Sequence, residues 1–182
     1  MTHRNAQPRL QRRQSGATLV ESAAVMTVLA VVAGSAVPGF DRALQRHRLE
    51  GAAVQLETDI HHARSLAVAQ NTPLRISFDN AAGCYVIHTG AAGQCTCSGD
   101  GTATCQGGAQ PQRSVSVAAG TQMGLRASVR SVLFDPLRGT STPTATIRLE
   151  SRNGIALHQV LNIMGRVRSC TPNGALEGYP RC

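Results

Sequence analysis

The stretch that decides the fold is residues 16–40, which read GATLVESAAVMTVLAVVAGSAVPGF. From Ser22 to Phe40 this stretch holds 19 consecutive residues without a charge, which is long enough for a helix to cross a hydrocarbon core. Residues 1–16 contain four arginines and no acid. The positive-inside rule therefore places the N-terminus in the cytoplasm and the rest of the chain on the other side of the membrane.

An ordinary secretory signal explains the same basic and apolar pattern. Gly34-Ser35-Ala36 offers a small-residue cleavage site for such a signal. Under this interpretation the mature protein begins at Val37 and is a soluble, secreted binding protein.

The junction between the basic and the apolar residues favours a different processing event. Gly16-Ala17-Thr18-Leu19-Val20-Glu21 resembles the signal of type IV pilins and type II secretion pseudopilins. The resemblance implies that a prepilin peptidase removes residues 1–16, cutting between Gly16 and Ala17, and methylates the new N-terminus at Ala17. Pro38 also matches a common position of the family, whereas Ala17 departs from it, because Phe is usual there.

Glu21 is the only charged residue between residues 17 and 40. A carboxylate deep in lipid costs about 2–3 kcal/mol unless it meets a cation. The family resemblance implies that it pairs with the N-terminal amine of a neighbouring subunit when helices bundle into a filament. The alternative is an interfacial carboxylate that reaches water.

Beyond the apolar stretch, small and aliphatic residues recur at spacings of three and four, as in an amphipathic helix with one buried stripe. The stripe comprises Leu44, Leu49, Ala52, Ala53, Leu56, Ile60, Ala63, Leu66 and Ala67. Asn71-Thr72-Pro73 is expected to end the helix. His61 and His62 are expected on its surface, and no metal site or cofactor is predicted.

After Pro73 the sequence changes to short extended runs separated by Gly, Pro, Asn and Asp. The predicted strands are residues 74–78, 84–88, 114–117, 128–134, 144–150, 155–163 and 166–170. Asn153-Gly154 predicts a two-residue hairpin turn, and residues 90–112 predict a loop or hairpin excursion. The fold class is therefore α+β, with one long helix, membrane-spanning and then amphipathic, packed on an antiparallel sheet.

Two short motifs narrow the family. Val132-Leu133-Phe134-Asp135-Pro136, followed by Arg138-Gly139, resembles the GspH/FimT branch, and so does Asn162-Ile163-Met164-Gly165-Arg166-Val167-Arg168. The branch contains minor pilins of type IV pili and a minor pseudopilin of type II secretion. The resemblance implies three parts: a leader in residues 1–16, a transmembrane half-helix in residues 17–42 and a periplasmic domain in residues 43–182.

Six cysteines in a chain of 182 residues suggest an oxidising compartment. Cys170 and Cys182 bracket the C-terminal tail, and many pilins close such a loop with a disulfide. Two pairings remain open for the other four: Cys84–Cys95 with Cys97–Cys105, or Cys84–Cys97 with Cys95–Cys105. A zinc site formed by these thiols and His88 is the second-ranked alternative.

The net charge of +8 is unevenly distributed. Residues 111–182 hold nine arginines against three acids, which gives +6, and such asymmetry suggests a polyanion-binding surface. No catalytic motif is present, so the chain is not expected to be an enzyme.

Gly165, Arg166 and Arg168 form the candidate DNA site. On a strand, Arg166 and Arg168 point to one face about 7 Å apart, with Arg148, Arg152 and Arg181 as candidate neighbours. In FimT-like minor pilins a Gly-Arg-x-Arg motif here is associated with DNA uptake. With only 3% aromatic residues, contact with duplex phosphates is expected rather than base stacking. The alternative is two solvated arginines, or an ion pair with Glu150 or Glu177.

The resulting hypothesis is a FimT-like minor type IV pilin, located in the inner membrane or in a pilus, that assists pilus assembly and binds double-stranded DNA for natural transformation. Its expected partners are the inner membrane, prepilin peptidase, other pilins and duplex DNA. The alternative is a GspH-type minor pseudopilin of type II secretion with a structural role and no DNA binding.

Overall fold

The computed structural model describes residues 18–120, 123–174 and 176–182, without the side chains of residues 35–38. The chain divides into two compact units, residues 1–41 and 42–182. One helix, α1 (Leu19–Gln70), runs through the described part of the first unit and into the second. Gly16 and Ala17 lie outside the described residues.

In the first unit, helix α1 carries apolar side chains around its surface, and none of those described is buried. Large exposed members are Val25, Met26, Val28, Leu29, Val31 and Val32. This segment is long and apolar enough to cross a membrane. Because an exposed apolar helix of this length is unfavourable in water, its composition suits an apolar surrounding.

In the second unit, α1 buries the predicted stripe. Leu49, Ala53, Leu56, Ile60, Ala63 and Ala67 are buried, and Ala52 and Leu66 pack beside them. The helix ends where the sequence predicted: Asn71 takes a positive φ of 49°, and the Thr72 amide donates to the Ala67 carbonyl at 3.1 Å. This is the Schellman arrangement that closes many helices.

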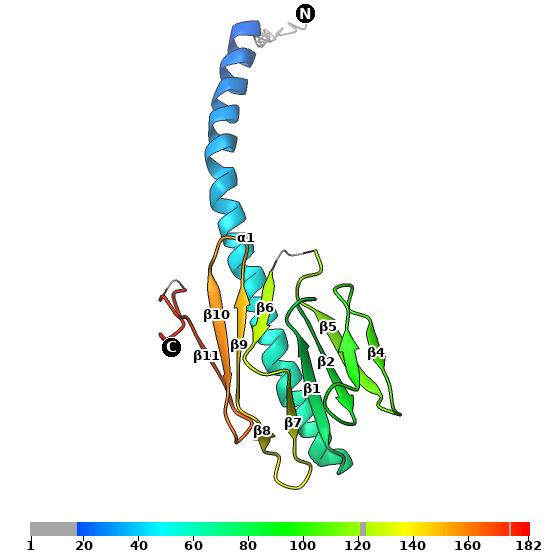
Figure 1. Cartoon of the computed structure of the whole chain (residues 1–182). Coiled ribbons are helices and arrows are strands. Elements are labelled where there is room, and N and C mark those ends of the chain that lie inside the picture. Colours follow the sequence, from blue (N-terminus) through cyan, green and yellow to red (C-terminus); the bar gives the residue numbers. More distant parts are fainter. Residues whose placement is uncertain (1–17, 121–122, 175) are drawn as a thin grey trace, which may run out of the picture. The chain divides into compact units, whose positions relative to one another are not determined.

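The strands of the second unit form two main antiparallel sheets and a small hairpin, rather than the one sheet that was predicted (Figure 1). One sheet has the order β5-β2-β1-β7-β8 and the other has the order β11-β10-β9-β6. The strands are β1 (Leu74–Asp79), β2 (Cys84–Thr89), β3 (Cys95–Cys97), β4 (Ala103–Cys105), β5 (Pro111–Ser116), β6 (Gly124–Ala127), β7 (Ser131–Phe134), β8 (Ser141–Thr142), β9 (Ala145–Glu150), β10 (Ala156–Leu161) and β11 (Val167–Cys170).

The prediction of one strand over residues 128–134 is wrong. The Ser128 amide donates to the carbonyl of Thr146 in β9, whereas the Phe78 amide of β1 donates to the Arg130 carbonyl. Residues 128–130 therefore carry the chain from one sheet to the other. Only residues 131–134 of the predicted segment form a strand, β7, and the residues before the crossing, 124–127, form β6 in the other sheet.

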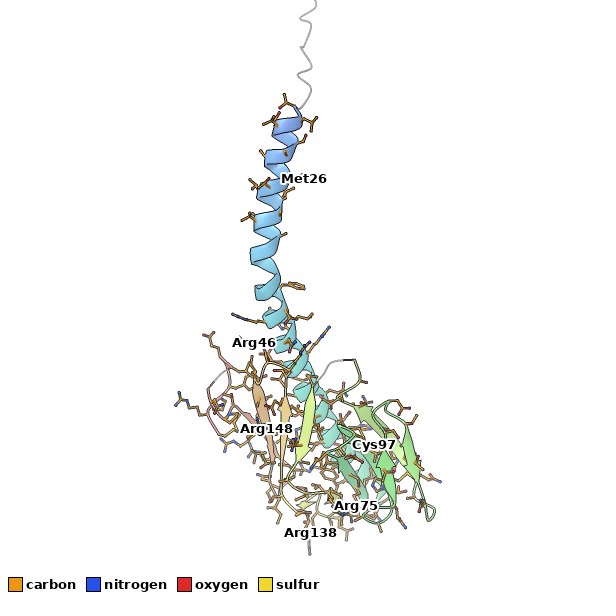
Figure 2. All side chains as sticks on the ribbon, turned by 45° about the horizontal axis from the view of Figure 1, so that its top comes forward. Met26, Arg46, Arg75, Cys97, Arg138 and Arg148 are labelled. Carbon is orange, nitrogen blue, oxygen red and sulfur yellow. A yellow bond between two sulfur atoms is a disulfide. The ribbon has the colours of Figure 1, made fainter. Side chains whose placement is uncertain are left out.

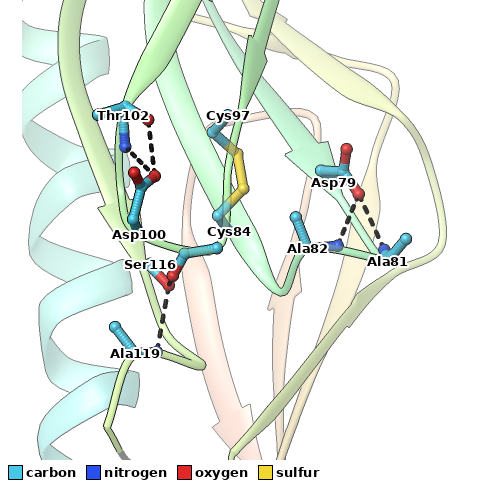
Figure 3. Close-up of a disulfide and its surroundings, with 10 residues drawn as sticks. Asp79, Ala81, Ala82, Cys84, Cys97, Asp100, Thr102, Ser116 and Ala119 are labelled. Carbon is cyan, nitrogen blue, oxygen red and sulfur yellow. Dashed lines mark hydrogen bonds between the residues drawn. A yellow bond between two sulfur atoms is a disulfide. The ribbon is translucent and has the colours of Figure 1, made fainter.

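The segment predicted as a loop or hairpin, residues 90–112, contains the β3–β4 hairpin, which is held by two disulfides. Cys84–Cys97 joins β2 to β3, and Cys95–Cys105 joins β3 to β4. Figure 3 shows the first of these disulfides beside the Asp79 and Asp100 turns. Of the two pairings left open by the sequence, the structure has the second, and Cys170–Cys182 is confirmed. The thiolates that the zinc alternative required are consumed in these bonds.

A buried polar cluster ties the helix to the five-stranded sheet. The Asp59 carboxylate on α1 is only 3% exposed. It accepts a hydrogen bond from the Tyr85 hydroxyl on β2 at 2.7 Å and another from Arg113 Nε on β5 at 2.9 Å. Burial, followed by the hydrogen bond to Asp59, raises the pKa of Tyr85 far above its ordinary value, so this hydroxyl stays protonated and donates.

Candidate nucleic-acid interface

Arg166 and Arg168 lie at the start of β11, directly after the turn that joins it to β10. Arg168 pairs with Val160 across the ladder. The strand begins at Val167 rather than at the predicted residue 166, but hydrogen bonding continues through Asn162, whose amide donates to the Arg166 carbonyl at 3.1 Å. Residue 167 is half-buried between two exposed arginines. The two guanidinium groups therefore emerge on one side, about 7 Å apart along the chain.

Neither arginine has a side-chain partner among the described residues. Glu150 is 3.0 Å from Arg148, and Glu177 receives a bond from Arg46 through its backbone carbonyl. The two ion pairs considered as the alternative for Arg166 and Arg168 are thus not formed. Both guanidinium groups keep their donors available for a ligand.

Gly165 has a structural place in the turn. It is the last of three turn residues, with φ of +72°, and its amide donates to the Asn162 carbonyl at 2.9 Å. This is a three-residue hairpin turn that ends in a left-handed residue. A Cβ at Gly165 would lie 2.8 Å from Arg64 Cδ and 3.3 Å from the Gly139 carbonyl oxygen. Because glycine has no Cβ, the turn at Gly165 can pack closely against Arg64 and Gly139. This packing fixes the position of the backbone from which Arg166 extends.

Basic side chains continue across the outer face of the four-stranded sheet. The register places Arg126 on β6 opposite Arg148 on β9, and Arg148 opposite His158 on β10. Burial lowers the pKa of His158, and the charge of Arg148 lowers it further, so His158 adds no positive charge at neutral pH. Figure 2 shows Arg148 on this sheet.

Of the three arginines predicted to lie near the site, one shares its face and two lie elsewhere. Arg148 shares the outer face with Arg168, two strands away. Arg152 lies in the β9–β10 loop, at the opposite end of β10, and Arg181 packs against Gly174 in the tail. Sequence analysis missed Arg126, although the alternation of apolar Leu125 and Ala127 with Gly124 and Arg126 could have identified a strand there.

At the N-terminal end of α1, Thr18 caps the helix. The Glu21 amide donates to Thr18 Oγ1 at 3.3 Å, which is one half of a capping box. Glu21 is exposed in the first helical turn, where its negative charge opposes the positive end of the helix dipole. The carboxylate is therefore available to a cation outside this chain.

No group of three or more His, Cys, Asp or Glu side chains that could hold a metal ion occurs within the described residues. A groove of about 490 Å³ is lined by residues of β1, of the β3 segment and of the approach to β7, which include Asp79, Asn80 and Arg130. Its lining contains no histidine and no free cysteine.

Comparison with known proteins places this architecture in a family. A family model described as Type II transport protein GspH matches residues 52–165, more than half of the chain. A comparison with curated proteins found no match.

Solved structures of one minor pilin, in two crystal forms, and of one pseudopilin are also similar. The type IV minor pilin FimU of Pseudomonas aeruginosa, in one crystal form, has a TM-score of 0.53 and 19% identity, covering 72% of this chain and 95% of that chain. In a second crystal form it has a TM-score of 0.50 and 18% identity, covering 70% and 97%. The minor pseudopilin EpsH of the Vibrio cholerae type 2 secretion system has a TM-score of 0.49 and 10% identity, covering 69% and 98%. The long helix on antiparallel sheets is shared with FimU, and the family model covers more than half of the chain: the chain belongs to the GspH family, described as Type II transport protein GspH.

Proposed function

We propose that this chain is a membrane-anchored minor pilin that binds duplex DNA through Arg166 and Arg168. The observation that carries the proposal is the pair of exposed guanidinium groups on one side of β11, with no partner among the described residues. They belong to the part of the chain with nine arginines against three acids.

The chemistry favours the phosphate backbone as the ligand. A guanidinium fork donates two parallel hydrogen bonds to phosphate oxygens, and the spacing of about 7 Å along the strand suits phosphates of one nucleic-acid strand. The described aromatic rings are few, and Tyr85 and Phe134 are fully buried. Stacking of single-stranded bases is therefore not supported, and a duplex bound with little sequence preference fits better.

The N-terminal half-helix supports membrane anchorage and assembly. Its exposed apolar surface suits a lipid or filament interior. We extend the proposal to processing: residues 1–16 are removed between Gly16 and Ala17, Ala17 is methylated, and Glu21 pairs with the terminal amine of a neighbouring subunit. In this proposal the second unit lies in the periplasm, and natural transformation is the process that uses the bound DNA.

Binding of the full chain in a non-ionic detergent to a fluorescent duplex, titrated at several salt concentrations, tests the DNA site. Each phosphate contact adds about 0.9 to the log–log salt slope, so Arg166→Gln with Arg168→Gln should flatten the slope by about 2. The double variant Arg48→Gln with Arg152→Gln removes the same charge from exposed positions elsewhere and should alter the slope less. All variants keep the leader arginines, whose contribution therefore cancels.

A double variant at Arg166 and Arg168 that binds as well as the parent would show that the site is wrong. The second candidate is a GspH-type pseudopilin with a structural role in type II secretion, which the description of the matching family model favours. If the parent does not bind duplex at low salt, DNA binding is wrong and the structural pseudopilin role is favoured.

A further inference from the structure

Two turns that are far apart in the sequence meet beside the candidate site. One joins β7 to β8 through residues 135–139, and the other joins β10 to β11 through residues 162–165. The Ser141 amide donates to the Ile163 carbonyl at 2.9 Å, and Ser141 Oγ donates to the Asn162 carbonyl at 2.6 Å. We call residues 135–139 and 162–166 together the two-turn apex. The two-turn apex contains parts of the two motifs identified in the sequence, at residues 132–139 and 162–168.

Hydrogen bonds within its turns and from helix α1 hold the two-turn apex in place. Asp135 Oδ1 accepts hydrogen bonds from the amides of Leu137 and Arg138, at 2.9 and 2.7 Å. Arg64 of α1 donates through Nε to the Gly139 carbonyl at 2.7 Å, and Gly139 and Gly165 are both buried. The one carboxylate of the apex is thus engaged by its own turn, and little ordering remains to be done on binding.

What the apex exposes is apolar at the tip and basic around it. Leu137 is 82% exposed, and Ile163 and Met164 are each 57% exposed. Arg138 and Arg166 are exposed in the same two turns, with Arg168 two residues further along. Neither Arg138 nor Arg166 has a side-chain partner among the described residues. Figure 2 labels Arg138 at this end of the second unit.

We propose that the two-turn apex is a single duplex-binding element, in which Arg138 is a third phosphate contact and the tip formed by Leu137, Ile163 and Met164 packs into the minor groove. This inference rests on the proposed function. The minor groove is about 6 Å wide and flanked by phosphates on both sides. A small aliphatic tip flanked by arginines suits that cross-section, since proteins that bind the minor groove place arginines in it and frequently insert apolar side chains between base steps.

A lipid surface is the competing ligand for a basic and apolar tip. Interfacial anchors rely on Trp and Tyr, but the chain has no Trp. Tyr85 is buried in the core, and Tyr179 belongs to the C-terminal tail. The apex therefore lacks the aromatic component of an interfacial anchor, and the duplex is favoured.

The test separates charge from apolar contact by using salt. Arg138→Gln should flatten the log–log salt slope for duplex binding by about 0.9, the value of one lost phosphate contact. Arg152→Gln is the matched control, because Arg152 is an exposed turn arginine at the opposite end of β10, and it should leave the slope unchanged. Ile163→Ser with Met164→Ser should keep the parent slope and weaken binding on the order of ten-fold at every salt concentration.

A competitor that occupies the minor groove of A·T duplex, such as netropsin, should displace the parent but leave the weakened binding of the Ile163 and Met164 double variant unchanged. Circular dichroism checks that each variant is folded. The inference is overturned if Arg138→Gln keeps the slope and the serine variant keeps the affinity. The proposed function then still stands if the Arg166 and Arg168 double variant loses binding.

Failure of the parent to bind duplex overturns the proposed function together with this inference. The parent chain is also placed, through its apolar helix, in phosphatidylcholine nanodiscs with and without phosphatidylglycerol, and amide hydrogen exchange of residues 162–166 is compared. If phosphatidylglycerol protects these residues while the serine variant keeps duplex binding, the tip is a lipid-contacting surface, and the assignment to the minor groove is wrong.

Discussion

Two glycines in equivalent turns differ in what surrounds them. Gly154 in the β9–β10 turn and Gly165 in the β10–β11 turn both have positive φ, of 80° and 72°. A Cβ at Gly154 would meet nothing within 4 Å, whereas at Gly165 it would meet Arg64 and Gly139. The two glycines therefore share a left-handed backbone conformation, but only Gly165 is closely packed against other residues.

This pair gives a controlled prediction. Gly154→Ala should lower the free energy of unfolding by about 1 kcal/mol, the cost of a left-handed non-glycine residue. Gly165→Ala should cost roughly 1–2 kcal/mol more, because Arg64 or the Gly139 backbone must also shift. Urea unfolding followed by circular dichroism measures both. Equal losses at the two positions would contradict the role given to close packing at the apex.

His88 predicts how stability depends on pH. Its Nδ1 donates to the Thr89 carbonyl, so Nε2 accepts from the Ser77 hydroxyl at 2.8 Å. Burial lowers the pKa of His88; the bond to Thr89 opposes the shift, and the charge of Arg75 adds to it. Below the unfolded value of about 6.5 the unfolded chain binds more protons than the folded chain. The stabilisation is thus complete above this pH and is lost as the pH falls through the folded value.

Unfolding measured between pH 7.5 and pH 5 should therefore show a falling free energy, and His88→Gln should flatten that decline. His62→Gln, an exposed position on α1, is the control and should leave the decline as in the parent. A variant at His88 with the parent's pH dependence would assign the decline to other groups.

At the scale of elements, the Asp59 cluster links α1 to both β2 and β5. Tyr85→Phe should lower the free energy of unfolding by about 1 kcal/mol, since one hydrogen bond is lost. Asp59→Ala should cost more, about 2–3 kcal/mol, since it leaves the buried Tyr85 hydroxyl without its acceptor. Glu57→Gln, on the same helix, is the control for removing a carboxylate. Nearly equal effects of Asp59→Ala and Glu57→Gln would show that the cluster does not couple helix and sheet.

The elements also show where sequence reasoning works and where it stops. The stripe from Leu49 to Ala67 was predictable because a period of 3.6 residues fixes which face is buried. The separation of β6 from β7 was not, because Val129 fits an extended strand, and the change of sheet depends on partners distant in sequence. The predicted Asn153-Gly154 turn exists, but it is a three-residue turn: the Ser151 amide donates to Ile155.

The candidate site was predictable in part for the same reason. Arg166 and Arg168 are two residues apart in the sequence, so their shared face follows from strand alternation. The meeting of residues 135–139 with residues 162–166 depends on how two different sheets are joined, which no local pattern records. The pairing of Cys84 with Cys97 was one of two alternatives that the sequence left open, and the β3–β4 register, which places Cys95 opposite Cys105, distinguishes them.

For the whole molecule, the decisive measurement is the mass of the membrane-bound form. We predict a mature chain that starts at Ala17 and carries one added methyl group, measured by intact-mass spectrometry of the membrane fraction. Gly16→Arg should leave the leader attached, because a bulky, charged side chain would block the proposed cleavage between Gly16 and Ala17. A mature start at Val37 would instead support removal of the whole apolar segment and a soluble product.

Glu21 adds a second test at this scale. Glu21→Ala should still insert into the membrane, because removing a carboxylate lowers the cost of insertion. Its incorporation into filaments should fall, since the partner of the neighbouring amine is lost. The fraction of the variant recovered in sheared filaments, compared with the parent at equal membrane abundance, gives the answer, and equal recovery would argue for an interfacial carboxylate.

The three disulfides use all six cysteines within one chain, so no thiol remains free. Copies of the protein therefore have no free cysteine with which to form disulfides to one another, so any assembly they form is held by non-covalent contacts as far as cysteines are concerned. The same pairing has a consequence for mutagenesis. Replacing one cysteine alone creates a reactive partner thiol that can link two subunits artificially. Cysteines in this protein should accordingly be removed two at a time, as Cys84 with Cys97, Cys95 with Cys105, or Cys170 with Cys182.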